Sequence, residues 1–302
     1  MHKISDFKMP KQLSLDTGWS IGETAFERIT TTLLEMSSVE RILEFGSGPS
    51  SIRLAMAFAE AEVLSIEGDW RNFAETMNLM QTFWDKRNLS IKYRPITLES
   101  YGDAEFLTYE DGMFWNEKMD CVIIDGPPVY TLRGREACLY QVYDQIKIGG
   151  LIILDDSRRY YEKQIVENWL SVYPGSFAVE IIREDHHLAV LRKIKSLTPC
   201  WDALSWLSDV QSVGETRSRI AKALSHVDDV YLRALAEANN CCETDLIGLF
   251  NTIRNIYGVT PERIQESTSR NSKLTSEAFK RKQNTCYMTI VNTFFRDAQF
   301  SH

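Results

Sequence analysis

The chain has 302 residues, a formal net charge of −8, and hydrophobic and charged shares of 44% and 25%. This composition is typical of a globular protein that folds as one large domain or two ordinary ones. The acidic balance disfavours nucleic acid as a partner, because gripping its backbone requires clustered Lys and Arg. No apolar run approaches the roughly 18–20 residues that a membrane helix needs. We therefore expect no nucleic-acid and no membrane partner.

The six cysteines indicate the redox compartment. They form no CxxC pair, and no His follows them at zinc-finger spacing. Cys121 lies in an apolar run, which is typical of a small core residue. Reduced thiols of this kind, together with a first segment that does not resemble a signal peptide, predict a cytoplasmic protein.

From about residue 41 the sequence alternates between short apolar runs and helical patterns. The first run, 41–45, breaks at Gly46-Ser47-Gly48, and a helical pattern follows. Four more buried strands are predicted in this region: 63–66, 90–96, 121–124 and 151–154. Apolar residues spaced three and four apart predict helices between the strands. We expect the helix before the last of these strands to end at Gly149-Gly150.

Two further strands, 177–182 and 188–191, are separated by only a few polar residues. A gap this short cannot contain a helix, so the pair should form an antiparallel hairpin. The alternation of buried strands and helices predicts a doubly wound α/β fold. We expect a mostly parallel seven-stranded sheet, closed by this hairpin, in a domain over 1–195.

After Lys195, helical patterns replace the strand-like runs. The clearest consists of Leu246, Phe250, Ile253 and Tyr257, and it stops at Gly258. We therefore predict a helical C-terminal region over 196–302. Such a region could serve as a lid over the site or as the interface of a homodimer.

The turn after the first strand indicates a ligand cradle. Glu44 precedes Gly46 and Gly48, and a helix starts near Ser50. Glycines let the backbone approach a ligand closely, and the start of a helix offers free N–H groups. Glu67 ends the second strand, where an acid can accept hydrogen bonds from ribose hydroxyls.

These motifs resemble those of the class I S-adenosylmethionine-dependent methyltransferases. The run from Glu44 to Gly48 resembles the family's E/DxGxG motif, and Glu67 matches its ribose-binding acid. Asp125 matches the acid that ends the fourth strand, and the closing hairpin is shared. The resemblance covers about residues 15–193 and implies a Rossmann-like fold with S-adenosylmethionine as cofactor. The cofactor-binding residues that it implies are Glu44, Gly46, Ser47, Gly48, Ser51, Glu67, Gly68, Trp70 and Asp125.

A nicotinamide-dependent dehydrogenase fits the glycine turn less well. Such an enzyme normally needs GxGxxG to admit a pyrophosphate, and Ser51 stands where the last glycine belongs. Trp70 has two interpretations, either beside the adenine or as the first residue on the core face of its helix.

Carboxylates follow two adjacent predicted strands. Asp125 ends one and Asp155-Asp156 ends the other, at the sheet edge where open α/β folds bind ligands. Three convergent carboxylates suit a hard cation such as Mg²⁺. The arrangement is similar to the metal site of catechol-type O-methyltransferases, with Asp156 in place of the usual amide. In this interpretation Asp125, Asp155 and Asp156 are the metal ligands.

A second interpretation needs no metal. Asp125 would orient or deprotonate the substrate's amine or hydroxyl, and alignment of the reacting groups would supply most of the rate. Asp156 and His186 are the other catalytic candidates, the latter if its hairpin folds over the site. Purely structural roles are also possible. Asp155 or Asp156 could cap the next helix, and Arg158 or Arg159 could form an ion pair with them.

The sequence therefore favours a cytoplasmic methyltransferase that transfers a methyl group to an oxygen or nitrogen of a small-molecule metabolite. One alternative is an enzyme that uses the same fold and cofactor for a different group transfer. Another is a non-catalytic binding or scaffold protein that works through the helical C-terminal region.

Overall fold

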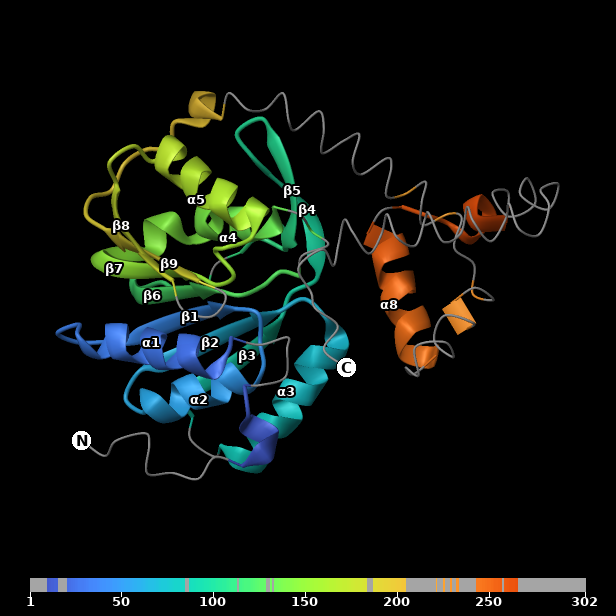
Figure 1. The fold of residues 1–302 in the computed structure, drawn as a ribbon, viewed down its shortest axis with the longest axis horizontal. Coiled ribbons are helices and arrows are strands. Elements are labelled where there is room, and N and C mark those ends of the chain that lie inside the picture. The colour runs from blue at the N-terminus through green and yellow to red at the C-terminus, as the bar shows by residue number, and fades with distance from the viewer. Residues whose placement is uncertain are drawn as a thin grey trace. The chain divides into compact units, whose positions relative to one another are not determined.

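The computed structural model describes two parts of the chain (Figure 1). The described residues are 10–15, 21–84, 87–112, 114–128, 131, 133–183, 187–204, 221, 225, 229, 232–233, 243–256 and 258–265. The chain divides into two compact units between residues 205 and 206. The predicted boundary between 195 and 196 stays a prediction, as do the roles suggested for the second part.

The first unit is built on a seven-stranded sheet with the order β3-β2-β1-β6-β7-β9-β8. All strands are parallel except β9, which pairs antiparallel with both β7 and β8. This confirms the predicted fold class and the closing hairpin. The strands are β1 (Arg41–Phe45), β2 (Glu62–Glu67), β3 (Leu89–Tyr93), β6 (Met119–Ile124), β7 (Ile146–Leu154), β8 (Phe177–Ile182) and β9 (Leu188–Lys193).

Helices cover both faces of this sheet (Figure 1). On one face lie α1 (Glu23–Leu34), α2 (Pro49–Ala57) and α3 (Trp70–Phe83). On the other lie α4 (Gly134–Val142) and α5 (Tyr160–Val172). The described residues of this unit also include the short 3-10 helices η2 (Lys11–Leu13), η4 (Tyr143–Gln145) and η5 (Trp201–Ala203).

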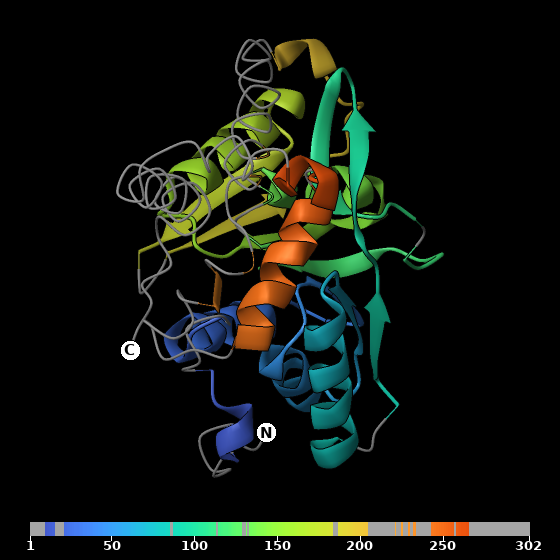
Figure 2. The same cartoon turned by 90° about the vertical axis from the view of Figure 1, so that its right-hand side faces the viewer.

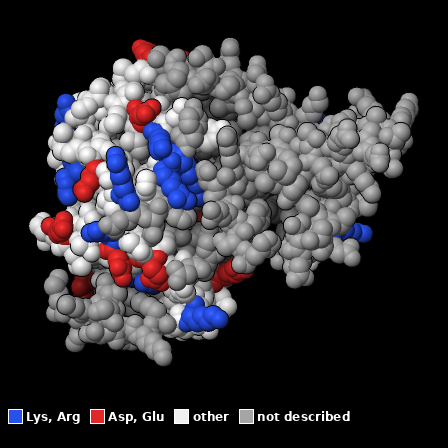
Figure 3. All heavy atoms as spheres, viewed as in Figure 1, with Lys and Arg blue, Asp and Glu red and all other residues white. Residues whose placement is uncertain are grey.

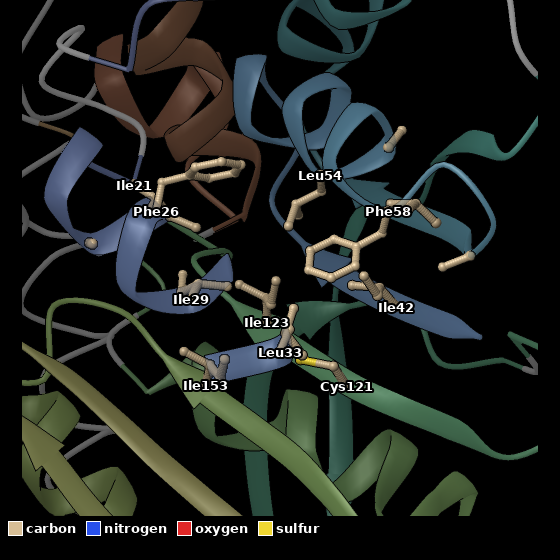
Figure 4. Close-up of a cluster of buried hydrophobic side chains, with 14 of the residues drawn as sticks. Ile21, Phe26, Ile29, Leu33, Ile42, Leu54, Phe58, Cys121, Ile123 and Ile153 are labelled. Carbon is tan, nitrogen blue, oxygen red and sulfur yellow. The ribbon is translucent and has the colours of Figure 1, made fainter. Parts of the chain in front are cut away.

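The sheet face under α1 carries a core of aliphatic and aromatic side chains (Figure 4). Phe26, Ile29 and Leu33 recur at helical spacing along α1, and each is at most 2% exposed. They pack with Ile123 and Ile153 from the central strands. Because fully burying one such side chain contributes roughly 1.5–3 kcal/mol, this packing fixes the sheet whose strand ends form the site.

An additional hairpin, which the sequence analysis missed, follows β3. Strands β4 (Ile96–Tyr101) and β5 (Ala104–Tyr109) pair antiparallel as a separate two-stranded sheet (Figure 2). The two-residue turn contains Gly102 at φ +59°, a backbone conformation that favours glycine. The predicted strand 90–96 is therefore wrong at its end, because the chain leaves the main sheet after Tyr93.

Gly149 and Gly150 do not end a helix, as the sequence had predicted, but lie inside β7. Helix α4 stops at Val142, and η4 leads directly into the strand. Gly149 has φ +86°. Met119 of β6 pairs with Ile146 of β7 and Cys121 pairs with Leu151, so the register between the two strands shifts across the segment that contains the two glycines. The two glycines thus allow an irregularity within a strand rather than the turn at the end of a helix.

In the second unit, the described residues include helix α8 (Glu243–Ile256). Gly258 follows it with φ +63°, as expected for the residue after a helix. The Oγ1 of Thr260 accepts a hydrogen bond from the backbone N–H of Arg263 at 3.4 Å, as the side chain of an N-cap residue does.

Acidic and basic side chains are interspersed on the face that Figure 3 shows. In the described residues, no helix is both long and apolar enough to cross a membrane.

Candidate functional site

The glycine turn joins β1 to α2 and forms the centre of the site. Gly46 has φ +99°, and a Cβ on this residue would lie 2.9 Å from the backbone nitrogen of Gly126. Glycine is required here for two reasons, the left-handed backbone and the close approach of the loop that follows β6. The turn after β1 and the loop after β6 are thereby held in contact.

Gly48 is different, because it faces open space. A Cβ on Gly48 would meet no atom within 4 Å, and its φ of 172° is extended backbone that any residue adopts. Gly48 is also the N-cap of α2, with Pro49 at the first helical position. A ligand can therefore approach the backbone at the start of this helix, where N–H groups favour polar or anionic groups.

Glu44, the residue before Phe45 at the end of β1, stabilises the glycine turn through serine hydroxyls. Its carboxylate is fully buried and accepts hydrogen bonds from the hydroxyls of Ser50 at 2.7 Å, Ser51 at 2.5 Å and Ser65. The Ser51 Oγ in turn accepts the backbone N–H of Gly48 at 3.1 Å. Burial raises the pKa of Glu44 to about 7, although the three hydroxyls oppose this. Glu44 thus acts on the cradle through Ser51.

Glu67, at the end of β2, accepts hydrogen bonds from Ser47 in the glycine turn and from the two residues that follow Glu67 itself. Its Oε2 accepts the backbone N–H of Ser47 at 3.0 Å and the Ser47 hydroxyl at 3.1 Å. Its Oε1 accepts the backbone N–H groups of Gly68 and Asp69, each at 2.8 Å. Burial raises the pKa of Glu67, and these hydrogen bonds lower it. The two acids of the motif therefore position the same turn from two strands.

Replacing Gly46 with alanine is expected to destabilise the protein by about 1–3 kcal/mol. Two costs add together: the backbone strain of a side chain at positive φ and the steric clash of its Cβ with the backbone of Gly126. Gly149→Ala is the matched control, with φ +86° and nothing within 4 Å of its Cβ. Urea unfolding of both variants checks this. Equal losses in the two variants would show that the close approach at Gly46 contributes nothing.

The strand-end acids do converge, as predicted. Asp125 follows β6, Asp155 and Asp156 follow β7, and one carboxylate oxygen from each lies within 4.8 Å of the others. Asp156 has φ +60°, a left-handed backbone conformation that is uncommon for a residue other than glycine. Burial raises the pKa of Asp125 to about 6, and Arg135 opposes this. Burial also raises the pKa of Asp155 well above its usual range, and Asp125 adds to this rise.

Two arginines already neutralise this cluster. The Nη1 of Arg135 lies 3.1 Å from the Oδ2 of Asp156, and its Nη2 lies 3.6 Å from the Oδ1 of Asp125. The Nη1 of Arg159 lies 2.6 Å from the same Asp156 oxygen, which confirms the pairing considered for Arg159. The predicted capping role is wrong, because Arg159 itself is the N-cap residue of α5 and no side chain caps that helix.

The donor set alone suits Mg²⁺, but the cluster with its guanidinium groups does not. A divalent ion about 4 Å from one guanidinium would be repelled by about 8 kcal/mol at an effective dielectric constant of about 20. The Oδ2 of Asp156 is contacted by two guanidinium groups, those of Arg135 and Arg159. An ion could take these oxygens only if Arg135 moved away.

The hairpin supplies a wall of the site that was not predicted. The Tyr109 ring is buried and stacks on Phe45 at 5.6 Å. A Cβ on Gly126 would lie 2.0 Å from the Tyr109 hydroxyl, and one on Gly68 would lie 3.0 Å from its ring. Gly68 therefore makes room for the hairpin, and its predicted contact with the cofactor stays a prediction.

Other predicted site residues fall outside what the structure describes. His186 lies outside the described residues, and the side chain of Trp70 is not described. A groove of about 580 Å³ lies between α1 and the β8–β9 hairpin. It contains none of the predicted site residues, and we assign no ligand to it.

Comparisons with known proteins give matches in structure only. No protein-family model matches the chain, and no curated protein is similar to it in sequence. It is similar to a SAM-dependent O-methyltransferase from Thermotoga maritima, with a TM-score of 0.42 and 13% identity over 59% of this chain and 67% of that one. It is also similar to precorrin-6y C5,15-methyltransferase from Geobacter metallireducens, with a TM-score of 0.41 and 15% identity over 64% and 96%.

A third similar structure is an SAH-bound methyltransferase from Podospora anserina, with a TM-score of 0.36 and 16% identity over 62% of this chain and 89% of that one. These neighbours are methyltransferases, as the motifs had led us to expect. Likenesses of this size carry no argument about activity or substrate. The assignment of fold rests on the observed strand order and register.

Proposed function

We propose that the chain is an S-adenosylmethionine-dependent methyltransferase that acts on an oxygen or nitrogen of a small-molecule metabolite. One observation carries this proposal. An open glycine turn, held by two buried acids, lies at the same sheet edge as a buried cluster of carboxyl groups. In open α/β sheets this edge is where ligands bind.

The residues at the turn fit the cofactor. Gly48 leaves the backbone open at the start of α2, where the amino-acid part of the cofactor would be held. Glu67 would hold the ribose hydroxyls. The Ser47 hydroxyl now donates its single proton to Glu67, and the Thr76 Oγ1, 3.1 Å away, is a second acceptor to which that proton can turn if a ribose hydroxyl takes its place at Glu67. When bound, the cofactor supplies an activated methyl group.

Asp125 is the residue that we assign to the substrate. It is adjacent in space to the turn, because its backbone nitrogen donates to the carbonyl of Phe45 at 3.0 Å. A carboxylate in this position would orient the substrate's hydroxyl or amine and accept its proton during transfer. Arg135, 3.6 Å from the carboxyl, opposes the rise in the pKa of Asp125 that burial causes. The rest of the rate would come from alignment of the reacting groups.

The test compares Asp125→Asn with the wild-type protein for methyl transfer from labelled S-adenosylmethionine to a panel of small hydroxyl and amino compounds. We expect kcat to fall by about 10²–10⁴-fold. Asp120→Asn is the control, since Asp120 lies near the start of β6, at the end away from Asp125, and its carboxylate accepts the backbone N–H groups of Glu40 and Arg41 instead. Calorimetry of cofactor binding, run in parallel, separates loss of the base from loss of the cofactor. Unchanged turnover in Asp125→Asn would remove this residue from the mechanism.

A further inference from the structure

Arg135 is the buried centre of the strand-end cluster. Besides the contacts with Asp125 and Asp156, its Nε donates to the carbonyl of Pro127 at 3.2 Å, and its Nη1 lies 3.8 Å from Glu162. The side chain is only 7% exposed. It therefore joins the loop after β6, the turn after β7 and the first turn of α5.

The cluster has the composition of a metal site with the metal position taken by a side chain. Four buried or nearly buried carboxyl groups lie around Arg135: Asp125, Asp155, Asp156 and Glu162. A buried carboxylate needs a partner of opposite charge, and a planar guanidinium with its fork of donors meets several oxygens at once. Arg135 thus meets carboxylates that follow two strands and one from a helix, and Arg159 adds a second cation beside Asp156.

We propose that Arg135 replaces the divalent cation that the strand-end acids would otherwise bind, so that this site works without a metal. Arg135 gathers Asp125 and Asp156 and holds Asp125 in place beside the glycine turn. It is a positioning residue, since it acts through Asp125 rather than on the substrate. The inference concerns the site of the proposed function and rests on it for the role of Asp125. Its test is metal binding, so the two can fail separately.

The experiment measures Mn²⁺ binding to the purified full-length protein by electron paramagnetic resonance, with Mn²⁺ as the probe. The wild-type protein should leave the signal of free Mn²⁺ unchanged at millimolar concentration, with or without S-adenosylhomocysteine. One tightly bound Mn²⁺ per chain, lost on Asp156→Asn, would overturn the proposal. This arm needs no arginine variant and remains decisive if such a variant fails to fold.

The second arm uses Arg135→Met, which removes the cation and keeps an extended side chain. We expect this variant to bind Mn²⁺ at least about tenfold more tightly than the wild-type protein, because the guanidinium that contacts both Asp125 and Asp156 is gone and only Arg159 still pairs with Asp156. Added Mn²⁺ should also raise its melting temperature, whereas that of the wild-type protein stays constant.

Arg133→Met is the matched control for this second arm. Arg133 is similarly buried and lies just before the same helix, but it pairs with Glu136, which is not one of the four cluster acids. It should gain no affinity for Mn²⁺. Equal affinity in Arg135→Met and Arg133→Met would contradict the replacement of a metal by Arg135.

Discussion

Replacing Gly48 with valine is expected to lower the affinity for S-adenosylmethionine by about 100-fold or more while the protein stays folded. The side chain would enter space that is empty in the folded chain, since no atom lies within 4 Å of the Cβ position. The extended backbone at Gly48 accepts any residue. The valine therefore blocks the backbone that the cofactor should approach, and a 100-fold loss corresponds to about 2.7 kcal/mol.

A graded series makes this prediction sharper. Gly48→Ala should weaken binding less than Gly48→Val, because it fills less of the same space. Calorimetry gives the affinities, and thermal unfolding shows that both variants remain folded. If both variants bound the cofactor like the wild-type protein, the open turn would not be the cofactor site.

The second large effect concerns Glu44 and pH. Burial raises the pKa of Glu44 from its ordinary value of 4.5 to about 7, so the folded state holds the proton more tightly than the unfolded state does. The stability that this proton contributes is fully present below about pH 4.5 and is lost as the pH rises through about 7. The loss due to Glu44 amounts to about 3 kcal/mol.

Glu44→Gln should remove this part of the pH dependence, because glutamine keeps the shape and never ionises. Between about pH 5 and pH 8, the free energy of unfolding of the wild-type protein should fall by about 3 kcal/mol more than that of the variant. Glu62→Gln, at the exposed start of the same β2 that carries Ser65, is the control and should follow the wild-type profile. Parallel profiles for wild type and Glu44→Gln would show that burial does not perturb Glu44. Guanidinium unfolding at a series of pH values measures both.

The parts of the site that sequence reasoning located are those that are local in the chain. Glu44, Gly46 and Gly48 lie within one strand–turn–helix unit, whose pattern of apolar residues and glycines is legible over a few residues. The convergence of Asp125 with Asp155 and Asp156 followed from parallel topology alone, because parallel strands end at the same edge.

The parts that were missed depend on contacts between distant segments. Nothing near Arg135 in the sequence shows that its guanidinium returns to two strand ends, since that depends on how α4 packs. The β4–β5 hairpin could have been predicted, because segments in which apolar and polar residues partly alternate flank a two-residue Gly102-Asp103 turn. Gly149 and Gly150 led to a wrong prediction because glycine both ends helices and permits irregularities within strands. Only the strand register, which the sequence does not contain, distinguishes these two roles.

Calorimetric titration of the purified protein with S-adenosylmethionine and S-adenosylhomocysteine tests the central claim most directly. We predict saturable one-to-one binding of both ligands, with the same affinity in the presence of Mg²⁺ and of a chelator. Absence of measurable binding to either ligand would contradict the assignment as a methyltransferase and would favour a binding or scaffold role for this fold.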